Sequence, residues 1–289
     1  MKSNLNDILS EDKIQSVLEL ALNAGYLAME MREGITIEEK TGPRDLVTSA
    51  DIALSELIVK TLKKEFPQTS IISEEDPEIN CDSELVWIID PIDGTQNYIL
   101  QDGQYSVMIG LLQNSKPVFG CVFEPEHGNL YYGGPMMDAW KIKTNTKEKT
   151  RLQARLDSDI FGEGDMLSKT RLMMGHRDRK KHPWVEDLDY INFVQFGSIG
   201  LKVARILENR ADLFVHLAGK LKVWDTAAPA AIALAAGLEV GTMNEDTLLF
   251  SLPEVYHKHP VIIGRKGSLG WCRKTILNET AKLSKSDAN

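Results

Sequence analysis

The sequence predicts a layered fold of the α+β or α/β class, with an N-terminal antiparallel sheet and a C-terminal, mostly parallel sheet, both covered by helices. Two observations predict it. Two amphipathic helices precede closely spaced apolar runs that end near residue 133, which is typical of an antiparallel meander. Beyond residue 170, short apolar runs alternate with helical periods, as in a parallel sheet. We therefore expect an N-terminal domain over residues 1–145 and a C-terminal domain over residues 146–289.

The N-terminal half begins with two predicted helices. Apolar residues recur with a helical period over residues 11–32, where Ser10 can cap the helix and Gly34 ends it. A second helix is expected at Ser49–Glu65, and Pro67 stops it. Strands are expected where apolar runs lie between turn residues, at Ser70–Ser73, 86–90, Ser106–Gln113, 118–124 and 130–133.

Residues 143–155 are polar and largely basic, and they suit a domain connection, an exposed loop or an edge strand. Beyond them strands and helices alternate. The expected strands are 172–175, 192–196, 211–216, 238–240 and Val261–Gly264. The expected helices are 183–188, 200–209, 225–236 and 269–283.

The composition narrows the classes of partner and site that this protein can have. The 289 residues are 43% hydrophobic and 26% charged, as in a soluble globular protein, and the net charge of −9 argues against a nucleic-acid polymer or a membrane as partner. Three scattered cysteines without a CxxC spacing favour neither a disulfide framework nor a zinc site. A polar N-terminal segment and the lack of a long apolar run predict a cytoplasmic protein.

The most informative segment is VWIIDPIDGTQNY, residues 86–98. A buried strand leads directly into Asp90 and Asp93, so two carboxylates lie at the strand's end. Magnesium prefers oxygen ligands and shares carboxylates with substrate phosphate, and two acids on a rigid turn can bridge a pair of ions. Gly94 and Thr95 then open a tight turn whose amides can receive an anion.

Three further segments carry acids that could join this site. Glu74 follows a predicted strand, Asp45 precedes the second helix, and Asp225 begins an apolar helix. Each acid alone has an ordinary explanation, as a solvated loop residue, a turn residue or a helix cap.

Together these segments resemble the inositol monophosphatase superfamily of magnesium-dependent, lithium-sensitive phosphatases. The matching motifs are DLVTSAD at 45–51, SEED at 73–76, WIIDPIDGT at 87–95 and WDTAA at 224–228. They occur in the family's order and with similar spacing, and the resemblance covers nearly the whole chain. It implies a phosphoric monoester hydrolase that uses two or three Mg²⁺ ions.

The resemblance also implies a role for each matched position. Glu74, Asp90 and the carbonyl of Ile92 would bind one metal, and Asp90, Asp93 and Asp225 a second. Gly94 and Thr95 would offer amides to the phosphate. Thr95 with Asp45 would orient or deprotonate the attacking water, and Glu74 would assist as a ligand. Glu75 is the alternative to Glu74 within the acidic cluster.

The substrate is predicted from a smaller set of residues. The segment with Gly197, Ser198 and Lys202 resembles the GSxxLK pattern of CysQ-like 3′(2′),5′-bisphosphate nucleotidases, which hydrolyse adenosine 3′,5′-bisphosphate to AMP and phosphate. His176 lies where nucleotidases carry a substrate-binding segment, and basic residues follow it. Residues 217–223 hold two lysines, Lys220 and Lys222, and no acid, whereas inositol monophosphatases tend to have an acid there.

Two alternatives stay open. The first is an inositol-1-monophosphatase or another sugar-phosphate phosphatase. The second is an inactive relative that binds metal and phosphate as a regulator, although Asp45 and Thr95 are both present. The sequence leaves the choice between a monomer and a homodimer undecided, and the expected partner is a small phosphorylated substrate.

Overall fold

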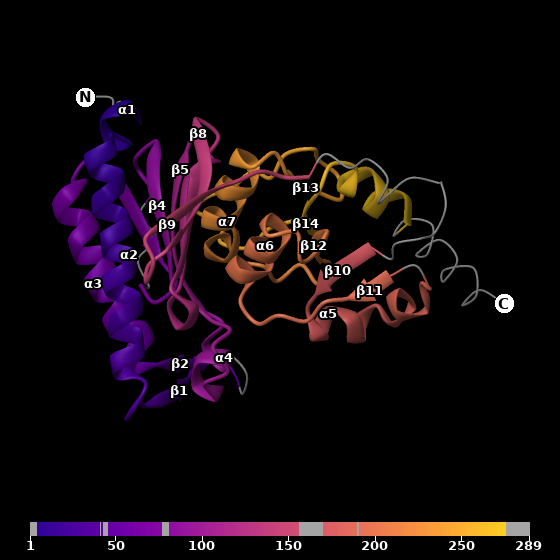
Figure 1. The fold of residues 1–289 in the computed structure, drawn as a ribbon, viewed down its shortest axis with the longest axis horizontal. Helices are drawn as coiled ribbons and strands as arrows, with labels where there is room; N and C mark the ends of the chain where they lie inside the picture. The colour runs from indigo at the N-terminus through magenta and orange to yellow at the C-terminus, as the bar shows by residue number, and fades with distance from the viewer. Residues whose placement is uncertain are drawn as a thin grey trace.

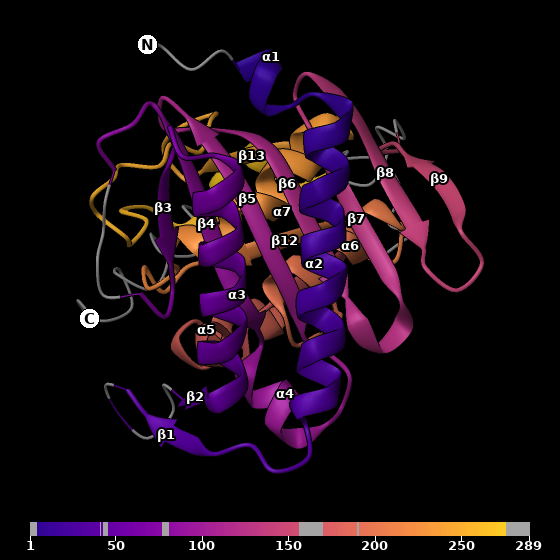
Figure 2. The same cartoon turned by 90° about the vertical axis from the view of Figure 1, so that its left-hand side faces the viewer.

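The computed structural model describes residues 5–40, 42, 46–76, 81–155, 170–189 and 191–275. Helices and two sheets stack in layers (Figure 1). The first layer holds α2 (Glu11–Met31) and α3 (Ser49–Glu65), which lie side by side over one face of the first sheet (Figure 2). Both helices were predicted within a residue or so of these bounds. The short helix α1 (Leu5–Ile8) precedes them.

The first sheet has seven strands in the order β3-β4-β5-β6-β7-β8-β9. Only β3 and β4 pair in parallel; the other neighbours are antiparallel, as the predicted meander requires. The bounds are β3 (Ser70–Ser73), β4 (Leu85–Asp93), β5 (Ser106–Gln113), β6 (Lys116–Glu124), β7 (Asn129–Gly134), β8 (Met137–Lys143) and β9 (Glu148–Leu152).

The polar stretch after residue 143 forms the edge of this sheet. Four of the five β9 side chains are exposed, which gives the edge a charged surface that discourages pairing with another chain. The edge-strand alternative is therefore correct, and β9 continues the first sheet to Leu152. The domain boundary at 145/146 stays a prediction.

The second sheet has five strands in the order β11-β10-β12-β14-β13. Four of them run in one direction and β14 runs against them, because β14 pairs antiparallel with both neighbours. The bounds are β10 (Thr170–Met174), β11 (Ile191–Phe193), β12 (Leu213–His216), β13 (Glu239–Thr242) and β14 (Val261–Gly264). The layered class expected from the sequence is confirmed.

Helices α6 (Ile199–Leu207) and α7 (Val223–Ala235) fill the space between the two sheets (Figure 1). Apolar residues of both sheets and both helices form one continuous core there. A second core joins α2 and α3 to the far face of the first sheet. The helix at 268–275 and the turn η3 (Pro183–Asp187) pack on the second sheet in a third core. Residues 276–283 of the predicted terminal helix lie outside the described residues.

Several short elements were not predicted. Strands β1 (Ile37–Glu39) and β2 (Leu46–Thr48) form a two-stranded sheet, and their three residues are too few for a periodic signal. Helices α4 (Thr95–Leu100) and α5 (His176–Lys181) and the turn η1 (Pro125–His127) are equally brief. Over the described ranges, every helix is too short or too polar to cross a lipid bilayer.

Candidate metal centre

Three carboxylates meet where β4 ends and α7 begins. Asp90 and Asp93 come from the end of β4, and Asp225 comes from the first turn of α7. One carboxylate oxygen from each lies within 4.8 Å of the others. The layering brings them together, because α7 packs directly on the face of the first sheet.

The backbone at the end of β4 is irregular, and this irregularity sets the direction of the two aspartates. The pairing of β4 with β5 shifts register between Asp90 and Asp93. Pro91 lies inside that shift and has no N–H to donate to a neighbouring strand, which is the usual setting of a proline in a sheet. A bulge of this kind bends the strand and re-aims its side chains.

Burial and mutual repulsion make it costly for the carboxylates of the cluster to be ionised together. Burial, followed by the charges of Glu74, Asp93 and Asp225, raises the pKa of Asp90 well above its ordinary value. Burial and the charges of Glu74 and Asp93 raise the pKa of Asp225 to about 8. The buried Oδ1 of Asp90 has no hydrogen-bond partner. An unpartnered carboxylate oxygen among other carboxylates suits a hard divalent cation such as Mg²⁺.

Asp93 is held by the first turn of α6. Ser198 caps that helix and donates a short hydrogen bond from Oγ to Asp93 Oδ2, while the Gly200 N–H donates to the same oxygen at 2.7 Å. Burial raises the pKa of Asp93, and these donors oppose the rise. A Cβ at position 200 would lie 2.6 Å from Met108 Sδ, so glycine allows this close approach.

Lys202 lies on the next turn of α6 and is 7% exposed. Its Nζ donates a short hydrogen bond to the Gly197 carbonyl. Burial lowers the pKa of Lys202, whereas the charges of Asp93 and Asp225 raise it. Gly197 in turn donates its N–H to Gln104 Oε1 at 2.9 Å. The structure thus brings Gly197, Ser198 and Lys202, which were predicted from the sequence, to the acidic cluster.

The turn after β4 places Thr95 beside the cluster. Gly94 adopts a left-handed conformation with φ of 94°, and Thr95 begins α4. The Thr95 hydroxyl lies 3.2 Å from the Ile92 carbonyl and 3.2 Å from Asp51 Oδ1. Asp45, the expected partner of Thr95, lies outside the described residues.

Glu74 and Glu75 follow β3 and are paired with lysines. Lys222 Nζ lies 3.1 Å from Glu74 Oε1, and Lys40 Nζ lies 2.6 Å from Glu75 Oε1 and 3.5 Å from Glu74 Oε1. Burial raises the pKa of Glu75 to about 7. Glu74 is also the largest source of unfavourable charge for Asp90 and Asp225, which places it electrostatically within the cluster.

His176 differs from the other predicted residues. It is exposed at the first position of α5, and within the described part of the chain no hydrogen bond ties it to the carboxylates. The helix is anchored instead through Asp178, which accepts from the Leu217 N–H at 2.9 Å and lies 3.3 Å from His216 Nδ1. A substrate contact from His176 stays a prediction.

Sequence reasoning assigned no role to Asp51, Gly200 or Lys40. Asp51 is the last residue of the DLVTSAD motif and forms a capping box with Thr48, so a local explanation was sufficient for it. Its contact to Thr95 joins the first turn of α3 to the first residue of α4, 44 residues further along the chain. Lys40 and Gly200 contact residues that are far away in the sequence, Glu75 and Asp93. No short sequence motif indicates such contacts.

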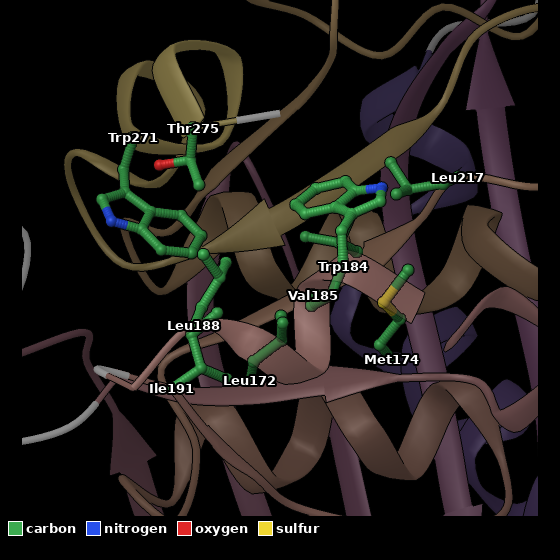
Figure 3. Close-up of a pocket in the computed structure, with 10 residues that line it drawn as sticks. Leu172, Met174, Trp184, Val185, Leu188, Ile191, Leu217, Trp271 and Thr275 are labelled. Atoms are coloured by element: carbon green, nitrogen blue, oxygen red, sulfur yellow. The ribbon is translucent and has the colours of Figure 1, made fainter. Parts of the chain in front are cut away.

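An apolar pocket lies apart from these residues, between the second sheet and the helix at 268–275 (Figure 3). Side chains from β10, η3 and the terminal helix converge on it, among them Met174, Trp184 and Trp271. Its free volume of about 20 Å³ has room for little more than one water molecule. The pocket is part of the third core and is too small for a nucleobase.

The model of the inositol monophosphatase family matches residues 11–282. The 3′(2′),5′-bisphosphate nucleotidase CysQ of Salmonella typhimurium is 31% identical over 248 residues, covering 84% of this chain and 96% of the relative. The inositol-1-monophosphatase of Bacillus subtilis is 25% identical and covers 88% and 90% of the two chains.

Among solved structures, an IMPase/NADP phosphatase complexed with Mg²⁺ and phosphate superposes with a TM-score of 0.70 at 20% identity, covering 91% of this chain and 93% of the other. At this identity the likeness concerns the fold. The family match spans most of the chain, and the cluster of Asp90, Asp93 and Asp225 suits the Mg²⁺ on which the family depends. The chain therefore belongs to the inositol monophosphatase family and is a phosphoric monoester hydrolase that acts on small phosphorylated substrates.

Proposed function

We propose that this phosphatase is a 3′(2′),5′-bisphosphate nucleotidase, which converts adenosine 3′,5′-bisphosphate to AMP and phosphate with two or three Mg²⁺ ions. The observation that carries the proposal is the buried position of Lys202 next to Asp93 and Asp225. Asp93 and Asp225 compensate the charge of this buried lysine as long as they are free carboxylates. Mg²⁺ bound by the same aspartates would offset their charge, and a polyanionic substrate would then supply the negative charge that Lys202 needs.

The region before α7 supports the same substrate class. Residues 217–223 contain lysines and no acid, so they favour an anionic substrate over the hydroxyl groups of a polyol. The 31% identical relative from Salmonella typhimurium is named as a nucleotidase of this kind. Both observations are independent of the geometry around Lys202.

Asp90, Asp93 and Asp225 would hold the ions, joined by Glu74 and the Ile92 carbonyl. Mg²⁺ bound there supplies positive charge for the phosphate and makes hydroxide available near neutral pH. The backbone amides of Gly94 and Thr95, at the turn into α4, would hold the phosphate oxygens.

Thr95 would orient the attacking water. Its hydroxyl hydrogen points to an acceptor, either Asp51 Oδ1 or the Ile92 carbonyl, so a lone pair of Oγ1 is left to accept from the water. Asp45 would be the second partner of that water. The water would lose one proton as its oxygen bonds to phosphorus. The bond from phosphorus to the 3′-oxygen would break, and the 3′-oxygen would take up one proton from solvent, so that the protons balance.

A substrate comparison tests the proposal. We expect kcat/KM for adenosine 3′,5′-bisphosphate to exceed that for inositol 1-phosphate and fructose 1,6-bisphosphate by about tenfold or more at the same Mg²⁺ concentration. Lithium should inhibit the reaction. A preference for inositol 1-phosphate would instead support the alternative, an inositol-1-monophosphatase, which the Bacillus subtilis relative favours. Failure to hydrolyse any ester in a broad phosphate panel would support the inactive regulator.

A further inference from the structure

Lys222 lies between the two halves of the candidate metal centre. Its Nζ is 3.1 Å from Glu74 Oε1, at the end of β3. Its backbone N–H donates to Asp225 Oδ2 at 2.6 Å, in the first turn of α7. One residue therefore contacts an acid of the first sheet through its side chain and an acid of α7 through its main chain.

The backbone around Lys222 is held by hydrogen bonds, whereas its side chain is long and partly exposed. Residue 222 forms a bridge with Tyr256, and the neighbouring Val223 N–H donates to the Val255 carbonyl at 2.8 Å. The side chain is 23% exposed, and its Nζ lies 5.1 Å from the centre of the Trp224 ring. A long, flexible stem over an aromatic ring can redirect its ammonium group without moving the helix.

A metal ion bound through Glu74 Oε1 would need the oxygen that Lys222 already contacts. Glu74 Oε1 accepts from the ammonium, and a cation coordinated by that oxygen would repel it. Lys40 is placed differently, because its closer partner is Glu75 at 2.6 Å and its distance to Glu74 is 3.5 Å. Lys222 is thus the ammonium that a metal on Glu74 would displace, whereas Lys40 keeps a carboxylate of its own.

We propose that Lys222 exchanges partners during the catalytic cycle: it competes with the metal ion for Glu74, and once displaced it binds the phosphate of the substrate that is not hydrolysed. The second half rests on the proposed function. The scissile phosphate would lie at the carboxylates. The Lys222 ammonium is 3.1 Å from Glu74, on a side chain that is 23% exposed, and is therefore placed to meet a second phosphate of the same substrate. Metal binding at Glu74 would thus free Lys222 to bind the second phosphate of a doubly phosphorylated substrate.

The first test measures metal binding without substrate. Mn²⁺ serves as a spectroscopic probe, and its dissociation constant is measured by electron paramagnetic resonance for wild type, Lys222→Gln and Lys258→Gln. Lys258 is an exposed lysine two residues beyond Tyr256, so its substitution removes the same charge nearby. We expect Lys222→Gln to bind Mn²⁺ about two- to fivefold more tightly, the range of a partly exposed ion pair. Equal tightening by Lys258→Gln, or no tightening by Lys222→Gln, overturns the competition.

The second test compares adenosine 3′,5′-bisphosphate with adenosine 3′-monophosphate, which keeps the scissile ester and lacks the second phosphate. In Lys222→Gln we expect KM for the bisphosphate to rise about tenfold or more, with little change for the monophosphate. Lys222→Arg should restore part of the difference. Equal changes for both substrates overturn the transfer to the second phosphate.

The two tests separate this inference from the proposed function. If wild type prefers inositol 1-phosphate to both adenosine esters, the proposed function fails, and so does the transfer half of the inference. Tighter Mn²⁺ binding by Lys222→Gln would still support the competition for Glu74 in that case.

Discussion

At the residue scale, each carboxylate of the centre has its own set of contacts. Asp93 Oδ2 receives donors from Ser198 and Gly200, whereas Oδ1 of Asp90 is buried without a partner. Donors that orient a metal-binding carboxylate contribute to metal affinity although they never touch the ion. Asp90 and Asp93 therefore differ in their surroundings even though they lie on one strand.

We predict that Ser198→Ala weakens Mg²⁺ binding about tenfold, because Asp93 loses one of its orienting donors. The same change removes the cap of α6 and should lower the free energy of unfolding by about 1 kcal/mol. Titration calorimetry measures the first effect, and urea denaturation in EDTA measures the second.

Ser10→Ala is the matched control, because Ser10 caps α2 without a side-chain hydrogen bond. This variant should change neither quantity. Unchanged Mg²⁺ affinity in Ser198→Ala would show that the α6 turn does not orient Asp93.

At the scale of elements, the position of α7 depends on how closely it approaches the first sheet. A Cβ added to Gly120 of β6 would lie 2.0 Å from the Ala228 carbonyl oxygen, and one added to Gly110 of β5 would lie 2.8 Å from the Ala228 nitrogen. Two strand glycines facing a run of alanines let the helix backbone lie directly on the sheet. This contact brings Asp225 to the end of β4.

Gly120→Ala should therefore destabilise the protein by about 1–3 kcal/mol, because the α7 backbone cannot yield locally. It should also lower Mg²⁺ affinity, since Asp225 moves with the helix. Urea denaturation and a metal titration measure the two effects.

Gly270→Ala is the control. Gly270 lies in the helix at 268–275 with nothing within 4 Å of the added Cβ, and alanine there should be neutral or slightly stabilising. If Gly120→Ala were as stable as this control, the close packing of α7 on β6 would be wrong.

At the scale of the whole molecule, buried ion pairs tie the layers and strands together. Arg205 of α6 forms a buried pair with Glu124 of β6 and so joins α6 to the first sheet. Asp212, which precedes β12, accepts from Arg171 of β10 at 2.8 Å and from Arg265 beyond β14 at 3.1 Å. The second sheet is thereby linked across three of its strands by one carboxylate.

Asp212 should make the free energy of unfolding decrease as the pH falls into the acidic range. Burial alone would raise the pKa of Asp212, but the hydrogen bonds and charge of Arg171 and Arg265 lower it below the ordinary value of 3.8. Because the pKa of Asp212 is lower in the folded than in the unfolded state, its ionised form stabilises the fold. This contribution is complete when the pH is above the unfolded pKa of 3.8, and it is lost as the pH falls through the folded pKa.

We expect Asp212→Asn to lower the free energy of unfolding at pH 7 by about 3 kcal/mol and to flatten the loss of stability in acid. Asp138→Asn is the comparison, because the Asp138–Arg151 pair is exposed and should be worth less than about 1 kcal/mol. Thermal melting between pH 3 and pH 7 measures both variants, and equal pH profiles for Asp212→Asn and wild type would contradict the linkage.

The long elements and the acidic motifs could be predicted from local patterns in the chain. Helical periods and apolar runs predicted α2, α3 and most strands, and the segment from Trp87 to Thr95 indicated carboxylates at the end of a buried strand. Helices, strands and short motifs are determined by residues that are close together in the sequence, so patterns within a short segment are sufficient to predict them.

The residues that contact those acids could be identified only from the packing of the layers. Ser198 reaches Asp93, Lys222 reaches Glu74, and Asp51 reaches Thr95 because α3, α6 and α7 pack against the first sheet. Their spacing along the chain carries no period that could indicate such contacts. The physical reason is that burial between layers, not sequence proximity, brings these charged and polar groups within hydrogen-bond distance.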